Sequence, residues 1–355
     1  MEEVIAPGRV APGRVGPGHV PKPRSQVIYE GKDITAHIEP LLIELSYSDC
    51  IEGESDTVEL LLLAADRRWQ NGWYPGHGDV LEVHLGYEGE PPLACGVFEI
   101  DEVELEGAPD VFRIKALGAG ITRRVRTNFA RAFDDKTLAD IAREIAARNQ
   151  LTLTGEIENI RIGRSTQTFE TDLAFLKRLA ASYGYAFSVR GAKLTFFKRA
   201  ELKAASSVLV IERAHLTRFR FRDKIRAIVT SATVACHEPA SRAVKTSTVQ
   251  DPNARGNVHS ADELKLNNRV ENESQARLQA DAAIDRANED QTCAEFSLPG
   301  DVRLVAGVNV TVHGFGKFDG KYTIHRSRHY LSRGTGYGTD LELKRVRDAQ
   351  QGAEP

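Results

Sequence analysis

The chain has 355 residues, which is more than one hydrophobic core usually serves, so we expect two or three packed domains. Apolar residues form 41% of the sequence and charged residues 27%, proportions that exclude a disordered or membrane-embedded class. Lysine and arginine number 47 against 50 aspartate and glutamate residues, so no overall field draws the chain to nucleic acid or to an anionic membrane.

The cysteines and the apolar runs indicate the environment of the chain. Four cysteines lie far apart without a C-x-x-C pair, which fits neither a zinc site nor a small disulfide scaffold and favours a reducing cytoplasm. The acidic start MEEVIAPGRV is not a secretory signal peptide. No run of about 18 apolar residues occurs, so we expect no membrane-spanning helix and no membrane binding by the chain itself.

Residues 6–20 read APGRV, APGRV and GPGHV, a pentapeptide repeated with proline and glycine in every copy. Proline removes backbone donors and glycine raises the entropy that is lost on ordering, so this segment holds neither a helix nor a central strand. We therefore expect residues 1–24 to form a disordered or polyproline-like arm.

Short strands are predicted throughout residues 25–118. Leu81, Val83 and Leu85 alternate with polar residues, and turn signals such as PGHGD and EGEPP separate the strand segments. Many short strands without a helix between them predict a small antiparallel barrel-like or sandwich domain.

The hydrophobic period changes to that of a helix in residues 119–204. Apolar residues from Leu138 to Ile145 fall at helical spacing, and Asp134 or Asp135 could cap the first turn. A second helix is predicted from Asp172 to Tyr183. This stretch is interpreted as an α/β module.

The second helix has recognisable end signals. Thr171 is its candidate N-cap, and Gly184 is placed to end it. The following YAFSVRGAKLTFFK predicts a hairpin that turns at Gly191.

Strand patterns resume at Val208 and define a third domain, residues 205–347, which is again barrel-like. A helix over residues 273–289 precedes three last strands, VNVTV, KYTIHRSRHYL and TDLELKRV. Residues 238–268 are too rich in Asn, Ser and charge for a core, so we expect a loop or a partner-ordered segment there; residues 348–355 form a polar tail. The predicted fold class is α+β, mainly β, with two β-barrel-like domains flanking the α/β module.

Two near-matches to ligand-binding motifs fail on spacing. GFGKFDGKY superficially resembles a phosphate loop, but only three residues separate Gly316 from Gly320, and Tyr322 stands where Ser or Thr would bind magnesium. His325 and His329 are four residues apart on a predicted strand, roughly 13 Å, which is too far to share a metal ion. We expect a turn at the first motif, packing or surface histidines at the second, and no cofactor.

Other catalytic patterns are equally weak. Cys236 and His237 are neighbours on a predicted strand and point to opposite faces, so they form no thiol and base pair. The acidic stretch 99–106 reads as a solvated strand face, although a glycosidase pair assembled from scattered carboxylates stays open. One basic cluster has only Phe129 to stack on a base, so we interpret it as a solvated or subunit-contacting patch and not as a nucleic-acid site. It comprises Arg123, Arg124, Arg126 and Arg131.

Two longer stretches carry a family likeness. The first is TLADIAREIAARNQLTL, followed after a short gap by TDLAFLKRLAASYGYAFSVRGAKLTFF, and the second is PGDVRLVAGVNVTVHGFGKFDGKYTIHRSRHYLSRGTGYGTDLELKR. They resemble the late control protein D family of contractile-tail baseplate hubs, which is similar to the hub of T4-like phages and to the amino-terminal part of type VI secretion spike proteins. The likeness covers most of residues 25–347. It implies a structural part in the shared fold for Asp172, Leu173, Phe175, Leu176, Leu179, Gly184, Gly307, Gly314, Gly320, Tyr322 and His329.

The resemblance implies a structural, non-enzymatic hub that joins a sixfold tail tube to a threefold spike. Family hubs are homotrimers in which two barrel-like domains per subunit alternate in a pseudo-sixfold ring, and such a closed ring needs complementary faces. The polar tail RDAQQGAEP directly follows the last strand, whereas secretion spike proteins continue into a β-helix, so the spike is expected to be a separate protein.

The implied partners are other copies of the chain, the spike, the tail tube and baseplate proteins, with no sequence-specific nucleic acid. The implied place is the virion tail baseplate or a tailocin particle, after assembly in the host cytoplasm. Two alternatives stay open: the hub of a type VI-like or extracellular contractile injection system, and a peptidoglycan hydrolase.

TRFRFR is the candidate contact segment. Strand alternation places Phe219 and Phe221 on one face, toward the core, and Arg218, Arg220 and Arg222 on the other. Three like charges along one strand are mutually unfavourable, so a neighbouring subunit or tail protein is expected to supply an acidic counterface. The alternative is a solvated stripe offset by acids of the same chain.

Overall fold

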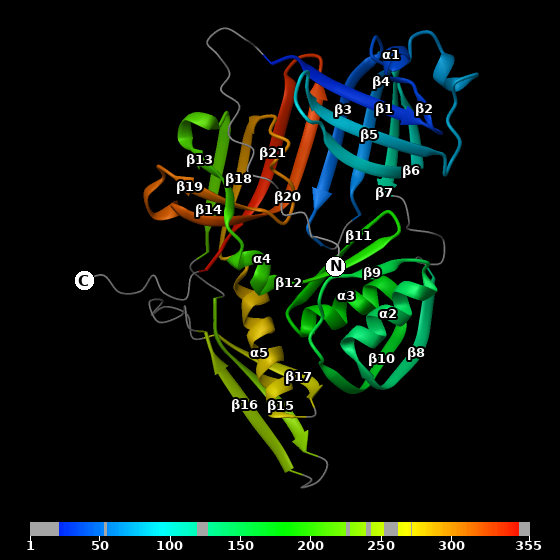
Figure 1. Ribbon diagram of the computed structural model, residues 1–355. Helices are drawn as coiled ribbons and strands as arrows, with labels where there is room; N and C mark the ends of the chain where they lie inside the picture. Colours follow the sequence, from blue (N-terminus) through cyan, green and yellow to red (C-terminus); the bar gives the residue numbers. More distant parts are fainter. Residues whose placement is uncertain are drawn as a thin grey trace.

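The computed structural model describes residues 21–52, 55–118, 127–224, 228–238, 243–251, 262–270 and 272–347. Strands dominate this part of the chain and a few helices accompany them (Figure 1), which confirms the α+β, mainly β class. None of the helices in the described ranges is both long and apolar enough to span a bilayer.

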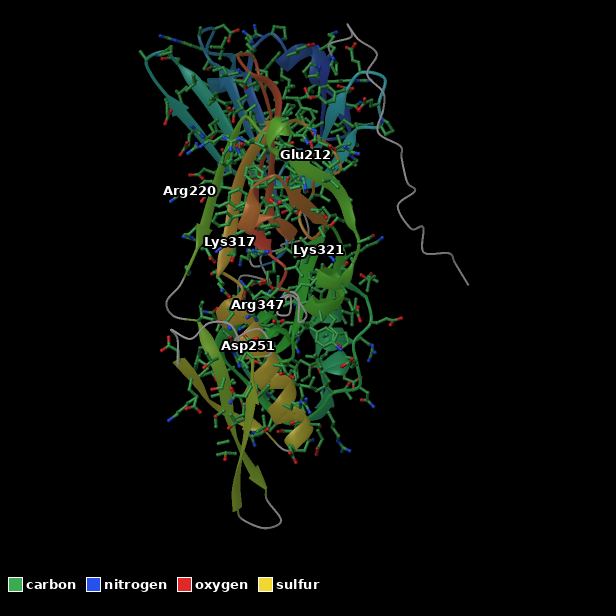
Figure 2. The ribbon with its side chains drawn as sticks, turned by 90° about the vertical axis from the view of Figure 1, so that its left-hand side faces the viewer. Glu212, Arg220, Asp251, Lys317, Lys321 and Arg347 are labelled. Carbon is green, nitrogen blue, oxygen red and sulfur yellow. The ribbon has the colours of Figure 1, made fainter. Side chains whose placement is uncertain are left out.

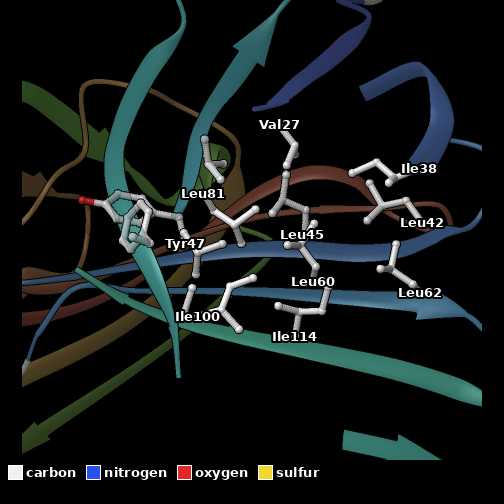
Figure 3. Packing of buried hydrophobic residues seen from close by; sticks show 14 of the residues in the cluster. Val27, Ile38, Leu42, Leu45, Tyr47, Leu60, Leu62, Leu81, Ile100 and Ile114 are labelled. Carbon is white, nitrogen blue, oxygen red and sulfur yellow. The ribbon is translucent and has the colours of Figure 1, made fainter. Parts of the chain in front are cut away.

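Residues 21–118 form a β-rich unit, which we call the first β unit. Its strands are β1 (Pro23–Tyr29), β2 (Lys32–Asp33), β3 (Leu42–Cys50), β4 (Thr57–Leu63), β5 (Val80–Tyr87), β6 (Leu93–Glu106) and β7 (Val111–Gly118), with the short helices α1 (Thr35–Ile38) and η1 (Arg68–Gln70). The strands are antiparallel in the order β3-β4-β7-β6-β5-β1-β2. Alternation along β4 buries Leu60 and Leu62, which pack with Val27, Leu45 and Leu81 (Figure 3).

Residues 127–198 form the middle module, which has its own core. Its elements are β8 (Asn128–Thr137), α2 (Leu138–Arg148), β9 (Thr152–Thr154), β10 (Arg161–Thr171), α3 (Asp172–Ser182), β11 (Tyr185–Arg190) and β12 (Lys193–Lys198). β8 pairs with β10, while β12 lies between β11 and β9 in a second small sheet. The predicted hairpin at Gly191 is confirmed, since β11 and β12 pair on either side of it.

The predicted N-cap of α2 is wrong, and the predicted N-cap of α3 is confirmed. Asp134 and Asp135 do not cap α2, because β8 continues through them to Thr137. The Thr137 hydroxyl accepts a hydrogen bond from the backbone N–H of Asp140, and the two residues form a capping box. The Thr171 cap of α3 is confirmed.

The second β unit follows the helix α4 (Arg199–Ala204). It contains β13 (Ser207–Glu212), β14 (Arg218–Asp223), β18 (Thr292–Pro299), β19 (Asn309–His313), β20 (Gly320–Ser332) and β21 (Gly336–Arg345), with the short helices η3 (Arg213–His215) and η5 (Gly316–Phe318). The strand order is β14-β18-β21-β20-β19-β13.

One strand joins the two β units. The first residues of β20 pair with β19, whereas the stretch from Arg326 to Ser332 pairs with β3 of the first β unit. A continuous sheet of thirteen strands in the described residues therefore runs through both units, with β14 at one end and β2 at the other.

A separate layer lies beside the middle module. β15 (Val229–Glu238), β16 (Ala243–Gln250) and β17 (Asp262–Val270) form a sheet that α5 (Glu273–Asn288) covers, as Figure 1 shows in yellow. The expectation of a loop over residues 238–268 is wrong, because β16 and β17 fall in that range. The packing residues of α5 are Ala276, Ala280 and Ile284, and a sheet covered on one face tolerates polar residues on the other.

Several expectations concern residues beyond the described ranges. These are the arm up to residue 20, the tail over residues 348–355, the cluster members Arg123, Arg124 and Arg126, and the side chains of Cys236 and His237. The arm is predicted to reach residue 24, but β1 already begins at Pro23, so residues 23 and 24 belong to the first β unit. The boundaries between domains stay a prediction.

Candidate assembly interface and buried polar groups

The arginine row of β14, which we define as Arg218, Arg220 and Arg222, lies on the surface of the second β unit. All three side chains are exposed, and Figure 2 shows Arg220 at the outer face. The Arg220 guanidinium lies 3.7 Å from the carboxylate of Glu295 on β18, and more than half of each side chain is exposed to solvent. A pair of this kind contributes little stability, and the role of the row as a contact surface stays a prediction.

The two phenylalanines between these arginines differ in burial. Phe221 packs on Phe296, Phe315 and Phe318, with ring centroids 4.8 to 5.3 Å away, as predicted for a core residue. Phe219 faces the same side, as predicted, with its ring 5.1 Å from that of Phe315, but it is 37% exposed and lies under the guanidinium of Arg213 at 4.9 Å, so it is only partly buried. The reason is position, because β14 ends the sheet and has a paired neighbour on one side only within the described residues.

Asp172 is a buried carboxylate at the first position of α3. It accepts hydrogen bonds from the Arg148 guanidinium at 3.1 and 3.2 Å, from Nδ2 of Asn149 at 3.1 Å and from Nε2 of Gln167 at 3.0 Å. These donors come from the end of α2 and from β10, so Asp172 fixes α3 against both elements. Its geometry indicates a structural role.

The other family-motif residues of the middle module form its core. Phe175, Leu176 and Leu179 are buried, and Leu173 is partly buried against them. Gly184 ends α3 with a φ of +77°, a left-handed conformation that favours glycine.

The motif glycines of the second β unit stand at turns. Gly307 and Gly314 are in left-handed turns. Gly320 has a φ of +142°, and a Cβ there would lie 3.2 Å from the Arg345 guanidinium. The phosphate-loop look-alike is therefore a turn between β19 and β20, as predicted, and the Tyr322 hydroxyl donates to the backbone carbonyl of Phe318 at 2.8 Å.

His329 is buried in a polar cluster of the second β unit. Its Nε2 lies 3.1 Å from the Leu304 carbonyl oxygen and its Nδ1 lies 2.9 Å from the Tyr337 hydroxyl. Burial lowers the pKa of His329 to about 4, so the ring is neutral at physiological pH. No group of three metal-ligating side chains occurs in the ranges that the structure describes.

Arg131 is the member of the predicted basic cluster whose position is described. Its guanidinium lies 4.1 Å from the ring centroid of Phe129. One face of the Phe129 ring is thus covered by the chain's own arginine, and the role of the cluster stays a prediction.

A buried carboxylate pair, which no sequence pattern predicted, lies between the first β unit and the middle module. Arg190, at the end of β11, places Nη2 2.5 Å from Asp49 and Nε 3.2 Å from Asp56, and the backbone N–H of Ala306 also donates to Asp49. Burial, followed by the charge of Asp49, raises the pKa of Asp56 to about 6. The three residues dock the β11–β12 hairpin on β3, and no local sequence pattern brings them together.

A second ionic network joins α4 and β21 to the residues that follow β3 and α5. The Arg199 guanidinium of α4 lies between Glu52, which follows β3, and Glu289, which follows α5, at 2.9 Å from the latter. Lys344 of β21 lies 3.4 Å from the same Glu289 carboxylate. Both networks connect parts of the chain that are far apart in sequence.

The chain is similar to phage tail proteins in both sequence and fold. The model of a family described as phage tail baseplate hub (GPD) matches residues 104–335. The probable baseplate hub protein of Escherichia phage 186 is 27% identical over 377 residues, covering 94% of this chain and 95% of that protein. The 43 kDa tail protein of prophage MuSo2 from Shewanella oneidensis has a TM-score of 0.70 and 15% identity, covering 92% of this chain and 99% of that one.

A fold similarity extends to secretion machines. An Escherichia coli component of the type VI secretion system, described as similar to two bacteriophage T4 tail proteins, has a TM-score of 0.58 and 11% identity, covering 95% of this chain and 79% of that one. These likenesses show the shared fold, whereas the family match spans more than half of the chain. The chain therefore belongs to the phage tail baseplate hub family, which confirms the resemblance found in its sequence.

Proposed function

We propose that this hub is non-enzymatic and that its copies form a homotrimeric, pseudo-sixfold ring between the tail tube and a spike. The observation that carries the proposal is the pairing of β20 with β3, which fixes two β units side by side in one chain. Each unit has its own buried cluster and is the barrel-like domain of the proposal. Three copies would then place six β units around one axis, which matches a sixfold tube and a threefold spike.

The proposed partners are copies of the chain, a separate spike, the tail tube and other baseplate proteins. As a baseplate hub the protein is a structural component of the virion tail; the proposal adds assembly in the host cytoplasm. No cofactor, membrane or specific nucleic-acid sequence takes part. We propose three folded domains with the boundaries 25–118, 119–204 and 205–347, with the start of the first moved to Pro23, where β1 begins.

The alternative is that the hub belongs to a type VI-like or extracellular contractile injection system. The fold shared with the Escherichia coli secretion component supports this alternative. The phage tail relatives match over more of their own length, so we favour the tail. A peptidoglycan hydrolase is less well supported, because both carboxylates of the buried pair Asp49 and Asp56 are paired with the Arg190 guanidinium.

Light scattering on the purified protein, alone and with the spike encoded beside it, tests the ring. We expect 117.6 kDa, three times the chain mass of 39.2 kDa, in at least one of the two conditions, with the spike mass added in the second. A monomer in both conditions would contradict the ring. Release of fragments from purified cell walls by the chain alone would contradict the non-enzymatic role.

A further inference from the structure

A second charged row lies on β6, in the first β unit, several strands away from β14 in the continuous sheet. Glu102, Glu104 and Glu106 are exposed at alternate positions of this strand. Glu104 lies 3.2 Å from Arg113 of the paired strand β7, whereas Glu102 and Glu106 have no ion-pair partner among the described residues. We call these three residues the glutamate row.

The two rows have the same number of charges and the same spacing. Alternate residues of a strand lie about 7 Å apart on one face, so three carboxylates and three guanidinium groups repeat with equal period. The charge pattern within each row also corresponds. Arg220 and Glu104, the middle members, have a partner in their own chain, while the outer members of both rows have none among the described residues.

The rows cannot meet within one copy of the chain. β14 is the last strand at one end of the continuous sheet, and β6 lies near the opposite end, separated from it by several strands of both β units. Figure 1 shows β14 on the left side of the second β unit and β6 on the right side of the first. A contact between the rows therefore requires two copies.

Each strand also has an exposed apolar side chain, on the face opposite its charged row. Phe219, which is 37% exposed, alternates with the arginines and lies 5.1 Å from the ring of Phe315, and Leu105, which is 50% exposed, alternates with the glutamates. Complementary charges at an interface set register and partner choice. The charged rows, and not these apolar side chains, therefore carry the proposed contact.

We propose that the arginine row of one copy contacts the glutamate row of the next copy. Because the two surfaces differ, the contact is heterologous, and its repetition closes a ring if the rotation between copies allows it. The inference rests on the proposed trimer and identifies the acidic surface that faces the arginines. Its main effect is to select register and neighbour, since charges at an interface favour specificity over affinity.

Charge reversal tests the contact. One variant replaces Arg218, Arg220 and Arg222 with Glu, a second replaces Glu102, Glu104 and Glu106 with Lys, and a third carries both sets. Trimer formation is measured by mass photometry against protein concentration, in the condition where the native chain is trimeric. We expect each single set to raise the concentration for half-assembly at least about tenfold, and the double set to return it to within about threefold of the native value.

Matched controls separate this effect from a general change of charge. Replacing three exposed cations of the middle module, Arg161, Arg164 and Lys193, with Glu changes the net charge equally and should leave assembly unchanged. Circular dichroism and thermal melting check that each variant folds. Added salt should weaken the native contact and should also relieve the repulsion in the single-set variants.

The outcomes distinguish the inference from the function on which it rests. A native trimer that tolerates both single reversals overturns the inference and leaves the ring intact. If only the arginine variant weakens trimer formation, or if the variant with both sets does not regain it, the contact between the two rows is overturned. Either result points to a different acidic partner for the arginine row. A native chain that is monomeric with and without the spike refutes the ring itself, and the inference with it.

Discussion

Replacing Arg190 with methionine tests whether the buried carboxylate pair docks the middle module on the first β unit. Met keeps part of the aliphatic stem and removes the cation that lies between Asp49 and Asp56. Breaking a buried ion pair costs about 3 to 5 kcal/mol of unfolding free energy. The Arg190 side chain is 53% exposed, so water already screens it in part, and we expect a loss of about 2 to 3 kcal/mol at pH 7.5.

The loss should depend on pH, because the carboxylates titrate as a pair. The pKa of Asp56 is raised from 3.8 to about 6, so the native state binds a proton more tightly than the unfolded state. The contribution of Asp56 to the free energy of unfolding is therefore largest below pH 3.8, and it is lost as the pH rises through about 6. Without Arg190 the two carboxylates repel each other, and one proton bound to the pair removes this repulsion. Arg190→Met should therefore lose less unfolding free energy at pH 5 than at pH 7.5.

Urea unfolding followed by tryptophan fluorescence measures this loss. Both tryptophans, Trp69 and Trp73, belong to the first β unit, so the signal reports the unit that holds the carboxylates. Adding Asp56→Asn to the variant should restore part of the stability at pH 7.5, because it removes one of two neighbouring negative charges.

Arg164→Met is the control for this experiment. The Arg164 guanidinium forms an exposed pair with Asp134 at 3.7 Å, so its removal should change the free energy of unfolding by less than about 0.5 kcal/mol at either pH. An equal loss for Arg190→Met at pH 5 and pH 7.5, or no recovery with Asp56→Asn, would refute the reasoning.

Three further predictions concern stability. Phe221→Ala should lower the free energy of unfolding by about 3 kcal/mol, and Phe219→Ala by about 1 kcal/mol, in urea titrations; equal losses would contradict the observed difference in burial. Asp172→Ala should cost about 3 kcal/mol because it leaves buried donors unpaired, against about 1 kcal/mol for the capping residue in Asp140→Ala, and calorimetry compares the two. Deleting residues 1–20 should leave the melting temperature unchanged, whereas a drop of several degrees would mean that the arm packs on the body.

The three longest helices in the described residues, α2, α3 and α5, follow from local sequence. The apolar spacing around α2 and α3, the hydroxyl of Thr171 and the glycine after α3 are neighbours in the chain, so each element could be located before any tertiary contact was known. The α2 cap failed by a few residues because strand β8 competes for Asp134 and Asp135. Strand alternation likewise placed the arginine row on one face of β14, since this geometry is intrinsic to a strand.

The interactions that organise the molecule are long-range and could not be predicted in this way. The pairing of β20 with β3 joins the two ends of the chain, and its hydrogen bonds are made by backbone groups that are alike in every strand. Asp49, Asp56 and Arg190 meet only because this sheet and the β11–β12 hairpin come together. Sequence alone determined the longer helices, the family and the charged face of β14. The tertiary structure decided that β16 and β17 form a sheet, which strands pair between the two β units, and which charges are buried.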